Sequence, residues 1–132
     1  MQLGVHRMGW DERITQVLDD PVILHAVGQG ALGIECRSDD TETLALADTL
    51  DHLETRLRCS AERSYMRELE GGCSVPLGVS SKIEKIESNS FLLSLTGSVT
   101  SLDGSEQVKH ASQIVIADGS KDDQIKQAEQ IG

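Results

Sequence analysis

The spacing of the apolar residues changes from that of a helix to that of a strand within the stretch Glu70-Gly71-Gly72-Cys73-Ser74-Val75-Pro76-Leu77-Gly78-Val79. This change indicates a fold that contains both helices and a sheet. From about residue 51 to residue 70, apolar side chains recur at the spacing of a helix, and two successive glycines are typical of a helix end. After Gly72 the apolar residues alternate with the others, which is the pattern of a β-strand. The helical positions are Leu53, Leu57, Ala61, Met66 and Leu69, and the alternating ones are Val75, Leu77 and Val79.

The sequence that follows predicts two more strands, over residues 91–99 and 108–117. Asp103-Gly104 between them is typical of a tight turn, so the three strands predict an antiparallel sheet. Helical spacing returns over residues 122–131 and continues to the end of the chain, which indicates truncation of the last helix. We therefore expect an α+β domain in which a three-stranded antiparallel sheet packs against helices.

The N-terminal part alternates between helical and strand patterns. Apolar spacing predicts a helix over residues 10–18, and Asp19-Asp20-Pro21 ends it because proline disfavours helix in the residue before it. Residues 31–36 predict a buried strand that follows a glycine-rich turn. Ser38-Asp39-Asp40-Thr41 then provides capping residues for a helix over residues 42–50.

Composition excludes several classes of protein. The chain has 132 residues, enough for one domain, and a net charge of −10, which argues against a general nucleic-acid binder. No apolar run is long enough to span a membrane, and the N-terminus lacks the apolar segment of a secretory signal. Three cysteines at wide spacing fit neither a disulfide framework nor a zinc site, and the four histidines lack metal-ligand spacing. We expect no metal site, core positions for Cys36 and Cys59, and a cytoplasmic location.

Cys73 is the first candidate functional residue. It lies on a predicted loop, where a thiol is more accessible than in a core, and Arg63 and Arg67 are near enough in sequence to favour the thiolate. The negative end of the preceding helix dipole works against the thiolate. On residue chemistry alone, a functional thiol and an ordinary small buried residue both remain open.

Two further motifs carry weaker signals. The glycines of Gly28-Gln29-Gly30 allow either a close approach to a ligand or a purely structural turn. This motif precedes a predicted strand, so it is not a dinucleotide-binding fingerprint. Arg7, in His6-Arg7-Met8-Gly9-Trp10, is by itself typical of a solvated surface residue.

Taken together and in this order, the motifs resemble those of the porphobilinogen deaminase (hydroxymethylbilane synthase) family. The resemblance covers nearly the whole chain and weakens after about Ala111. The Gly-Gly-Cys-Ser-Val-Pro segment is similar to the family's cofactor-attachment signature. The other matching segments are Arg7-Met8-Gly9-Trp10, Ala26-Val27-Gly28-Gln29-Gly30-Ala31-Leu32-Gly33, Glu62-Arg63 and Gly97-Ser98-Val99-Thr100-Ser101-Leu102-Asp103-Gly104.

The resemblance implies a transferase that joins four porphobilinogen molecules into the linear tetrapyrrole hydroxymethylbilane and releases ammonia. It implies a dipyrromethane primer bound by a thioether to Cys73, next to Gly72. Arg7 would bind carboxylates of the cofactor or substrate, and Gln29 would face the active-site cleft. Gly28, Gln29 and Gly30 would form a hinge, and Arg67 is a weaker candidate with a structural role near the cofactor loop.

The resemblance also implies what this segment lacks. The family's catalytic aspartate and its main arginine cluster precede this part of the chain, so no catalytic residue is expected here. Residues 1–26 would be the tail of family domain 2, residues 27–51 the returning segment of domain 1 with the hinge, and residues 52–132 the truncated C-terminal cofactor-attachment domain. The first two are partial segments of the family's α/β domains.

We therefore expect the isolated chain to be inactive. Its expected partners are porphobilinogen, the growing polypyrrole and the missing N-terminal domains. We expect it to bind neither nucleic acid nor a membrane. Without those domains, the strand over residues 31–36 should expose an edge or repack, whereas the part from about His52 should fold alone. The alternative is a non-enzymatic remnant or splice product that serves as a small binding or regulatory module. A third possibility is an unrelated thiol-dependent protein.

Overall fold

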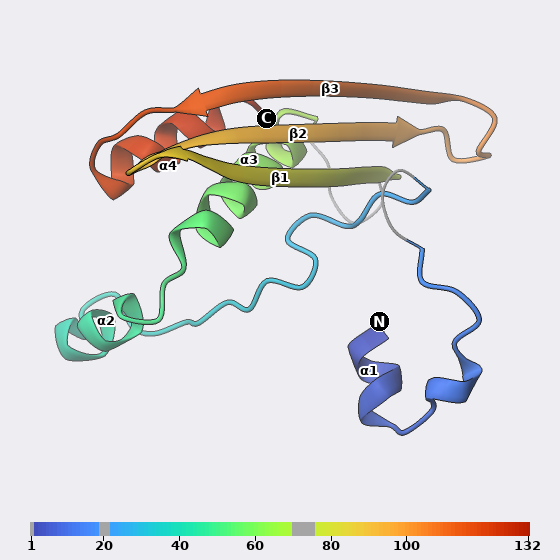
Figure 1. The fold of residues 1–132 in the computed structure, drawn as a ribbon, viewed down its shortest axis with the longest axis horizontal. Helices are drawn as coiled ribbons and strands as arrows, with labels where there is room; N and C mark the ends of the chain where they lie inside the picture. The colour runs from blue at the N-terminus through green and yellow to red at the C-terminus, as the bar shows by residue number, and fades with distance from the viewer. Residues whose placement is uncertain (1, 19–21, 70–75) are drawn as a thin grey trace.

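The computed structural model describes residues 2–18, 22–69 and 76–132, and their arrangement is α+β, as predicted (Figure 1). A sheet and two helices form the C-terminal part, and two short helices precede them along the chain. The helices are α1 (Gln2–Arg7), α2 (Thr41–Asp48), α3 (Leu53–Glu68) and α4 (Lys121–Glu129), with a 3₁₀ turn η1 at Asp11–Arg13. The strands are β1 (Leu77–Glu87), β2 (Ser90–Thr100) and β3 (Gln107–Ile116).

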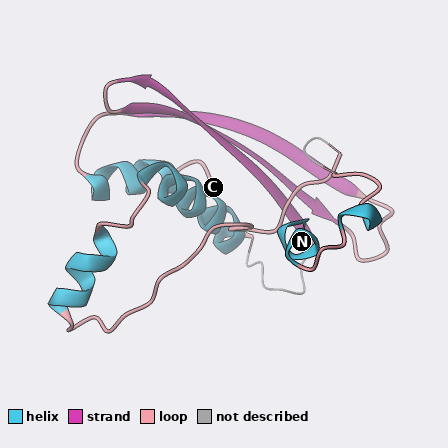
Figure 2. Ribbon diagram, turned by 60° about the horizontal axis from the view of Figure 1, so that its bottom comes forward, coloured by secondary structure: helices cyan, strands magenta, loops and turns pink. Residues whose placement is uncertain are grey.

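The sheet is antiparallel in the order β1-β2-β3, with β2 in the centre. Both α3 and α4 lie on one face of it, and the other face is open (Figure 2). Successive side chains of a strand point to opposite faces, so alternate residues of β2 meet the helices. Leu93 of β2 is fully buried there, and its neighbours in register are Ile83 and Ile114.

The hydrophobic core lies between this sheet and the two helices. α3 contributes Leu57 and Ala61, and α4 contributes Ala128, all fully buried. Burial of this aliphatic surface is the main force that holds the two layers together. The core cluster comprises Leu57, Ala61, Phe91, Leu93, Ile116 and Ala128, with Leu53, Ile83, Ile114, Ile125 and Ile131 packed around it.

The turn between β2 and β3 is where the sequence predicted it. Gly104 has a φ of 74°, a left-handed conformation that glycine adopts without strain. The Asp103 carboxylate accepts hydrogen bonds from the Ser101 hydroxyl (2.6 Å) and from the Ser105 backbone N–H (3.1 Å). These bonds, the Ser101 bond first, lower the pKa of Asp103 to about 2.

Three predicted helices are confirmed, and each begins at a capping residue. Asp40 accepts from the Thr43 N–H at the start of α2, and His52 Nδ1 accepts from the Thr55 N–H at the start of α3. Ser120 caps α4 in the same way through the Asp123 N–H. Helix α3 ends at Glu68. The predicted helix end at Gly71-Gly72 lies outside the described residues.

The prediction of a helix over residues 10–18 is wrong. Only Asp11–Arg13 forms a turn of 3₁₀ helix, and the helix lies earlier, at Gln2–Arg7. Val17 and Leu18 are exposed by 44% and 45%. Trp10 provides no side-chain cap before this turn, and Ile14 after it has the extended φ and ψ angles of −83° and 109°, so the turn does not continue as a helix.

The predicted buried strand over residues 31–36 is also wrong. Leu32 is 96% exposed and Ile34 62% exposed, and no strand among the described residues pairs with this segment. A strand is stable only beside a hydrogen-bonded neighbour, so its pattern alone does not produce one. Cys36, expected in a core with this strand, is exposed, whereas Cys59 on α3 is half-buried.

Ion pairs connect α2 to the C-terminal part. Lys121 Nζ lies 2.6 Å from Asp48 Oδ1 and 2.6 Å from Asp51 Oδ2, and Arg56 Nε lies 2.7 Å from Asp51 Oδ1. Burial acts to raise the pKa of Asp51, but hydrogen bonds from Lys121 and Arg56 outweigh it and lower the pKa. Hydrogen bonds to Asp48 and Asp51 raise the pKa of Lys121. Charges therefore join α2 to α4 where apolar packing does not.

Candidate functional site

The glycine motif of the N-terminal part forms a tight turn. Gly28 and Gly30 have φ angles of 69° and 86°, which only glycine adopts readily. The Gln29 N–H donates to the Ala26 carbonyl (3.0 Å) and the Ala31 N–H to the Gly28 carbonyl (3.1 Å). The turn presents the Gln29 side chain at the surface.

The residues just before this turn lie against the outer edge of β1. His25 and Val79 exchange two backbone hydrogen bonds, of 2.9 and 2.8 Å, and form an isolated antiparallel bridge. Leu24 packs so close to Gly78 that a Cβ at Gly78 would lie 2.8 Å from the Leu24 Cβ. The N-terminal segment therefore docks directly on β1, the strand that follows Cys73 in the sequence.

A buried carboxylate joins the turn to helix α3. Glu62 is only 7% exposed. Its Oε2 accepts from the Gly28 N–H (2.7 Å) and its Oε1 from the Ser81 hydroxyl (2.5 Å). Arg58 Nε donates to the same Ser81 hydroxyl oxygen (2.9 Å). The turn, α3 and β1 thus meet at one hydrogen-bonded cluster, which we call the Glu62 cluster (Gly28, Arg58, Glu62 and Ser81).

The Glu62 cluster borders an open depression of about 610 Å³. Its charged side chains are of both signs, with Arg58 and Lys82 against three glutamates. The depression is lined by His25, Ala26, Gln29, Glu54, Arg58, Glu62, Val79, Ser80, Ser81, Lys82, Ile83 and Glu84. It is therefore a polar hollow where the N-terminal segment meets the C-terminal part, and it offers both donors and acceptors to a ligand.

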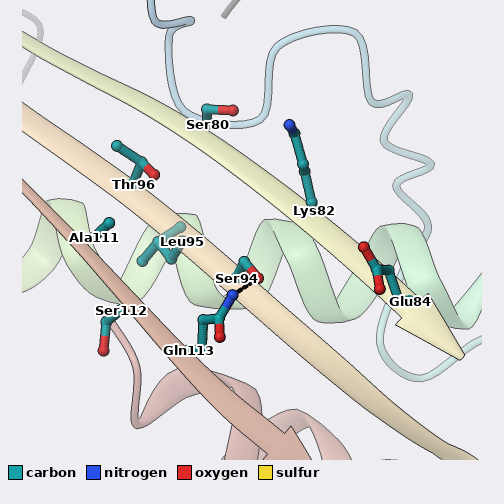
Figure 3. Close-up of a pocket in the computed structure, with 9 residues that line it drawn as sticks. All are labelled: Ser80, Lys82, Glu84, Ser94, Leu95, Thr96, Ala111, Ser112 and Gln113. Carbon is teal, nitrogen blue, oxygen red and sulfur yellow. Dashed lines mark hydrogen bonds between the residues drawn. The ribbon is translucent and has the colours of Figure 1, made fainter. Parts of the chain in front are cut away.

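A second hollow, of about 730 Å³, lies on the open face of the sheet. Figure 3 shows side chains from all three strands around it, and the Gln113 amide donating to the Ser94 hydroxyl (2.9 Å). None of the predicted site residues lines it. Uncharged polar side chains predominate there, and its two charged residues, Lys82 and Glu84, also line the depression beside Glu62.

The structure brings together some of the predicted site residues and separates others. Gln29 lines the depression, and Gly28 bonds to Glu62 at its border. Arg7 is exposed in the last turn of α1 and does not line the depression. Gly72 and Cys73 lie outside the described residues. Arg67 forms an ion pair with Glu129 of α4 at 3.1 Å, which fits the structural role expected for it.

Sequence reasoning missed the roles of Glu62 and Ser81, although a signal was present. Alternation along β1 places Ser81 on the inward side, between Val79 and Ile83. A buried hydroxyl needs a hydrogen-bond partner, so a serine at position 81 indicates a polar residue opposite it on the facing helix. Glu62 lies next to the core residue Ala61 on α3 and meets that requirement.

Of the two described cysteines, Cys36 is exposed and Cys59 is half-buried. Burial first, and then the Glu62 charge, raise the pKa of the Cys59 thiol, which disfavours its thiolate at neutral pH. Within the described ranges, no group of three or more His, Cys, Asp or Glu side chains is placed to hold a metal ion. Nor does this part of the chain contain a helix with the length and apolarity to cross a membrane.

Fold and site define a class: an α+β domain whose sheet edge is bridged by an N-terminal segment, with a glycine turn bound to a buried carboxylate. The family of that class follows from sequence comparison. Residues 56–132 match the family model described as "Porphobilinogen deaminase, C-terminal domain". Residues 2–45 match the one described as "Porphobilinogen deaminase, dipyromethane cofactor binding domain". The chain belongs to the porphobilinogen deaminase family, as its motifs predicted.

Curated relatives agree with this assignment. The chain is 52% identical over 106 residues to a porphobilinogen deaminase of Nostoc sp., a match that covers 80% of the chain and 31% of the relative. It is 54% identical over 101 residues to that of Gloeobacter violaceus (76% and 30%) and 48% identical over 109 residues to one of Prochlorococcus marinus (83% and 33%). The chain therefore spans about a third of the length of the relatives it matches.

Proposed function

We propose that this chain is the C-terminal portion of a cytoplasmic hydroxymethylbilane synthase, which condenses four porphobilinogen molecules and releases ammonia. Cys73 carries a dipyrromethane primer through a thioether, and the primer is the group on which the polypyrrole grows. The family membership of both matched segments carries the proposal. A covalent tether keeps a growing chain in one site, so the entropic cost of rebinding it after each addition is avoided.

The position of Cys73 in the sequence supports this role. Residues 70–75 connect the end of α3 to the start of β1, and both flanking elements are anchored in the core. Rigid elements before and after a segment in the sequence suit one that must hold a reactive group in place. Strand β1, which follows these residues in the sequence, is the strand on which His25 docks.

The charges of the described site support an incomplete enzyme. Pyrrole substrates of this family carry carboxylates, and arginines bind carboxylates best through two parallel hydrogen bonds. The depression holds Arg58 and Lys82 against Glu54, Glu62 and Glu84, so its residues fit a polyanionic ligand poorly on their own. Arg7 would be a further carboxylate ligand only together with domains that precede this segment. We therefore propose that the isolated chain is inactive.

The proposed domain boundaries place residues 1–26 in family domain 2, residues 27–51 in the returning segment of domain 1, and residues 52–132 in the cofactor-attachment domain. Helix α3 begins at Leu53, after its His52 cap, which supports the last boundary. The turn at Gly28, Gln29 and Gly30 is then the hinge, with Gln29 facing the cleft. The partners are porphobilinogen, the polypyrrole and the N-terminal domains.

Mass spectrometry tests the proposal. The chain would be co-expressed with the N-terminal two-thirds of the Nostoc enzyme, and its intact mass measured. We expect the mass increment of a dipyrromethane on the wild-type chain, loss of that increment in Cys73→Ala, and its retention in Cys36→Ala. An unmodified chain in a complex that consumes porphobilinogen, or turnover by the isolated 132-residue chain, would contradict the proposal.

A further inference from the structure

The turn at residues 26–31 is held between two contacts with the C-terminal part: the backbone bridge from His25 to Val79 just before it, and a hydrogen bond to one side chain of helix α3. Its own two hydrogen bonds lie within the turn, from Gln29 to Ala26 and from Ala31 to Gly28. The bond from the Gly28 N–H to Glu62 Oε2 spans 34 residues of sequence. It is therefore the contact that relates the orientation of the turn to α3.

The surroundings of Glu62 make this contact strong. A carboxylate that accepts from a backbone N–H forms a charge-assisted hydrogen bond, about twice as strong as a neutral one. Glu62 is buried, so its carboxylate must keep its partners, because an unpaired buried charge is very costly. The Ser81 hydroxyl donates a hydrogen bond to Glu62 Oε1, and Arg58 Nε donates one to the oxygen of that hydroxyl.

The conformation of Gly28 makes the contact specific. With a φ of 69°, its backbone belongs to the left-handed region, and its N–H is directed at α3. Gln29 follows directly and lines the depression next to Glu62 and Arg58. Because Gln29 follows Gly28 directly, the bond at Gly28 restricts where the Gln29 backbone can lie.

We propose that Glu62 is a positioning residue, which holds the Gly28 turn against α3 and thereby sets where Gln29 stands in the depression. This inference rests on the proposed function, in which Gln29 faces the cleft and the turn is the hinge between domains. Glu62 itself touches neither substrate nor cofactor in this role. It gives the hinge one preferred orientation relative to the cofactor-bearing domain.

Amide hydrogen exchange of the 15N-labelled 132-residue chain tests this role. The Gly28 amide reports on the contact, and the Leu93 amide in β2 reports on the folding of the sheet. In Glu62→Ala we expect Gly28 to exchange at least about tenfold faster relative to Leu93, since a hydrogen bond to a charged group is lost. In Glu62→Gln the neutral amide oxygen still accepts, so we expect a smaller acceleration and an upfield shift of the Gly28 proton.

Ser81→Ala is the matched control, because it removes the other donor to Glu62 but leaves the Gly28 contact. We expect Gly28 protection relative to Leu93 to stay within about threefold of wild type there, less than the loss of a charged hydrogen bond. If Glu62→Ala does not fold, the comparison of Glu62→Gln with Ser81→Ala tests the proposal. Faster Gly28 exchange relative to Leu93 in Glu62→Gln than in Ser81→Ala supports it. Equal effects in the two variants, or unchanged Gly28 exchange in folded Glu62→Ala, would overturn it. Neither result bears on Cys73, whose loading tests the family reaction separately.

Discussion

The two halves of this chain differ in what their apolar residues contact. Before Asp51 none of the described residues is buried, although this part carries many large apolar side chains. From Leu57 onward, the apolar residues of α3, the three strands and α4 close a core. Both halves have clear hydrophobic patterns. Apolar residues are therefore buried only where the same chain supplies the opposing surface, even though helix α2 forms without one.

The largest difference in stability between variants of the two halves should come from truncating a core leucine. Leu93→Ala removes a fully buried side chain from the centre of the sheet, so we expect a loss of about 2–5 kcal/mol in the free energy of unfolding. The matched variant Leu46→Ala affects a side chain that is 68% exposed on α2, and should change it by less than about 0.5 kcal/mol. Urea denaturation measures the free energy of unfolding of both variants. Equal losses would show that Leu46 is packed as tightly as Leu93.

A glycine in β2 should give the next largest effect. A Cβ at Gly97 would lie 2.5 Å from the Tyr65 ring of α3, so Gly97→Ala should cost about 1–3 kcal/mol through overpacking. In a Tyr65→Ala background the same change should cost much less, because the ring is gone. Gly33→Ala is the control, since a Cβ at Gly33 would have no neighbouring atom within 4 Å. Thermal unfolding of the single and double variants measures these losses. If Gly97→Ala cost as much in the Tyr65→Ala background as in wild type, the contact between residue 97 and the Tyr65 ring would be contradicted.

These contacts also show what the sequence could predict. The three strands, the turn at Gly104 and helices α3 and α4 follow from local patterns whose partners lie within the same chain, and helix α2 follows from its Asp40 cap. The strand over residues 31–36 was mispredicted because its alternation of apolar residues needs neighbours that the described part of the chain does not provide. Glu62 was overlooked as an anchor because its partner Gly28 lies 34 residues away and donates through its backbone, which leaves no side-chain signature.

The ion pairs between α2 and α4 should contribute less than either packing contact. Lys121→Met removes both the Asp48 and the Asp51 pairs, and we expect a loss of about 1 kcal/mol, because the Asp48 pair lies at the surface and the more buried Asp51 keeps Arg56 as a partner. The visible effect should be local, as faster amide exchange in α2 with unchanged exchange in β2. Lys126→Met, on the exposed side of α4, serves as the control. A loss of β2 protection in Lys121→Met would show that α2 is part of the core unit.

The smallest effect should come from acidification. Hydrogen bonds lower the pKa of Asp103 to about 2, and those from Thr43 lower the pKa of Asp40. A lowered folded-state pKa stabilises the structure above the ordinary value of 3.8, and that contribution is lost as the pH falls from about 4 towards 2. NMR titration of the side-chain carboxyl carbons should therefore show Asp103 titrating last. An Asp103 midpoint near 3.8 would contradict the hydrogen-bonded turn.

The described residues from Leu53 onward fold as a unit, whereas the described residues up to Leu50 lack a core of their own. Hydrogen exchange of the whole chain tests this difference most directly, segment by segment. We predict strong protection over β1, β2, β3 and the facing turns of α3, weak protection over residues 2–18 and 31–50, and intermediate protection at His25 and Gly28. Uniform protection along the chain, or protection of residues 31–36 equal to that of β2, would contradict the account.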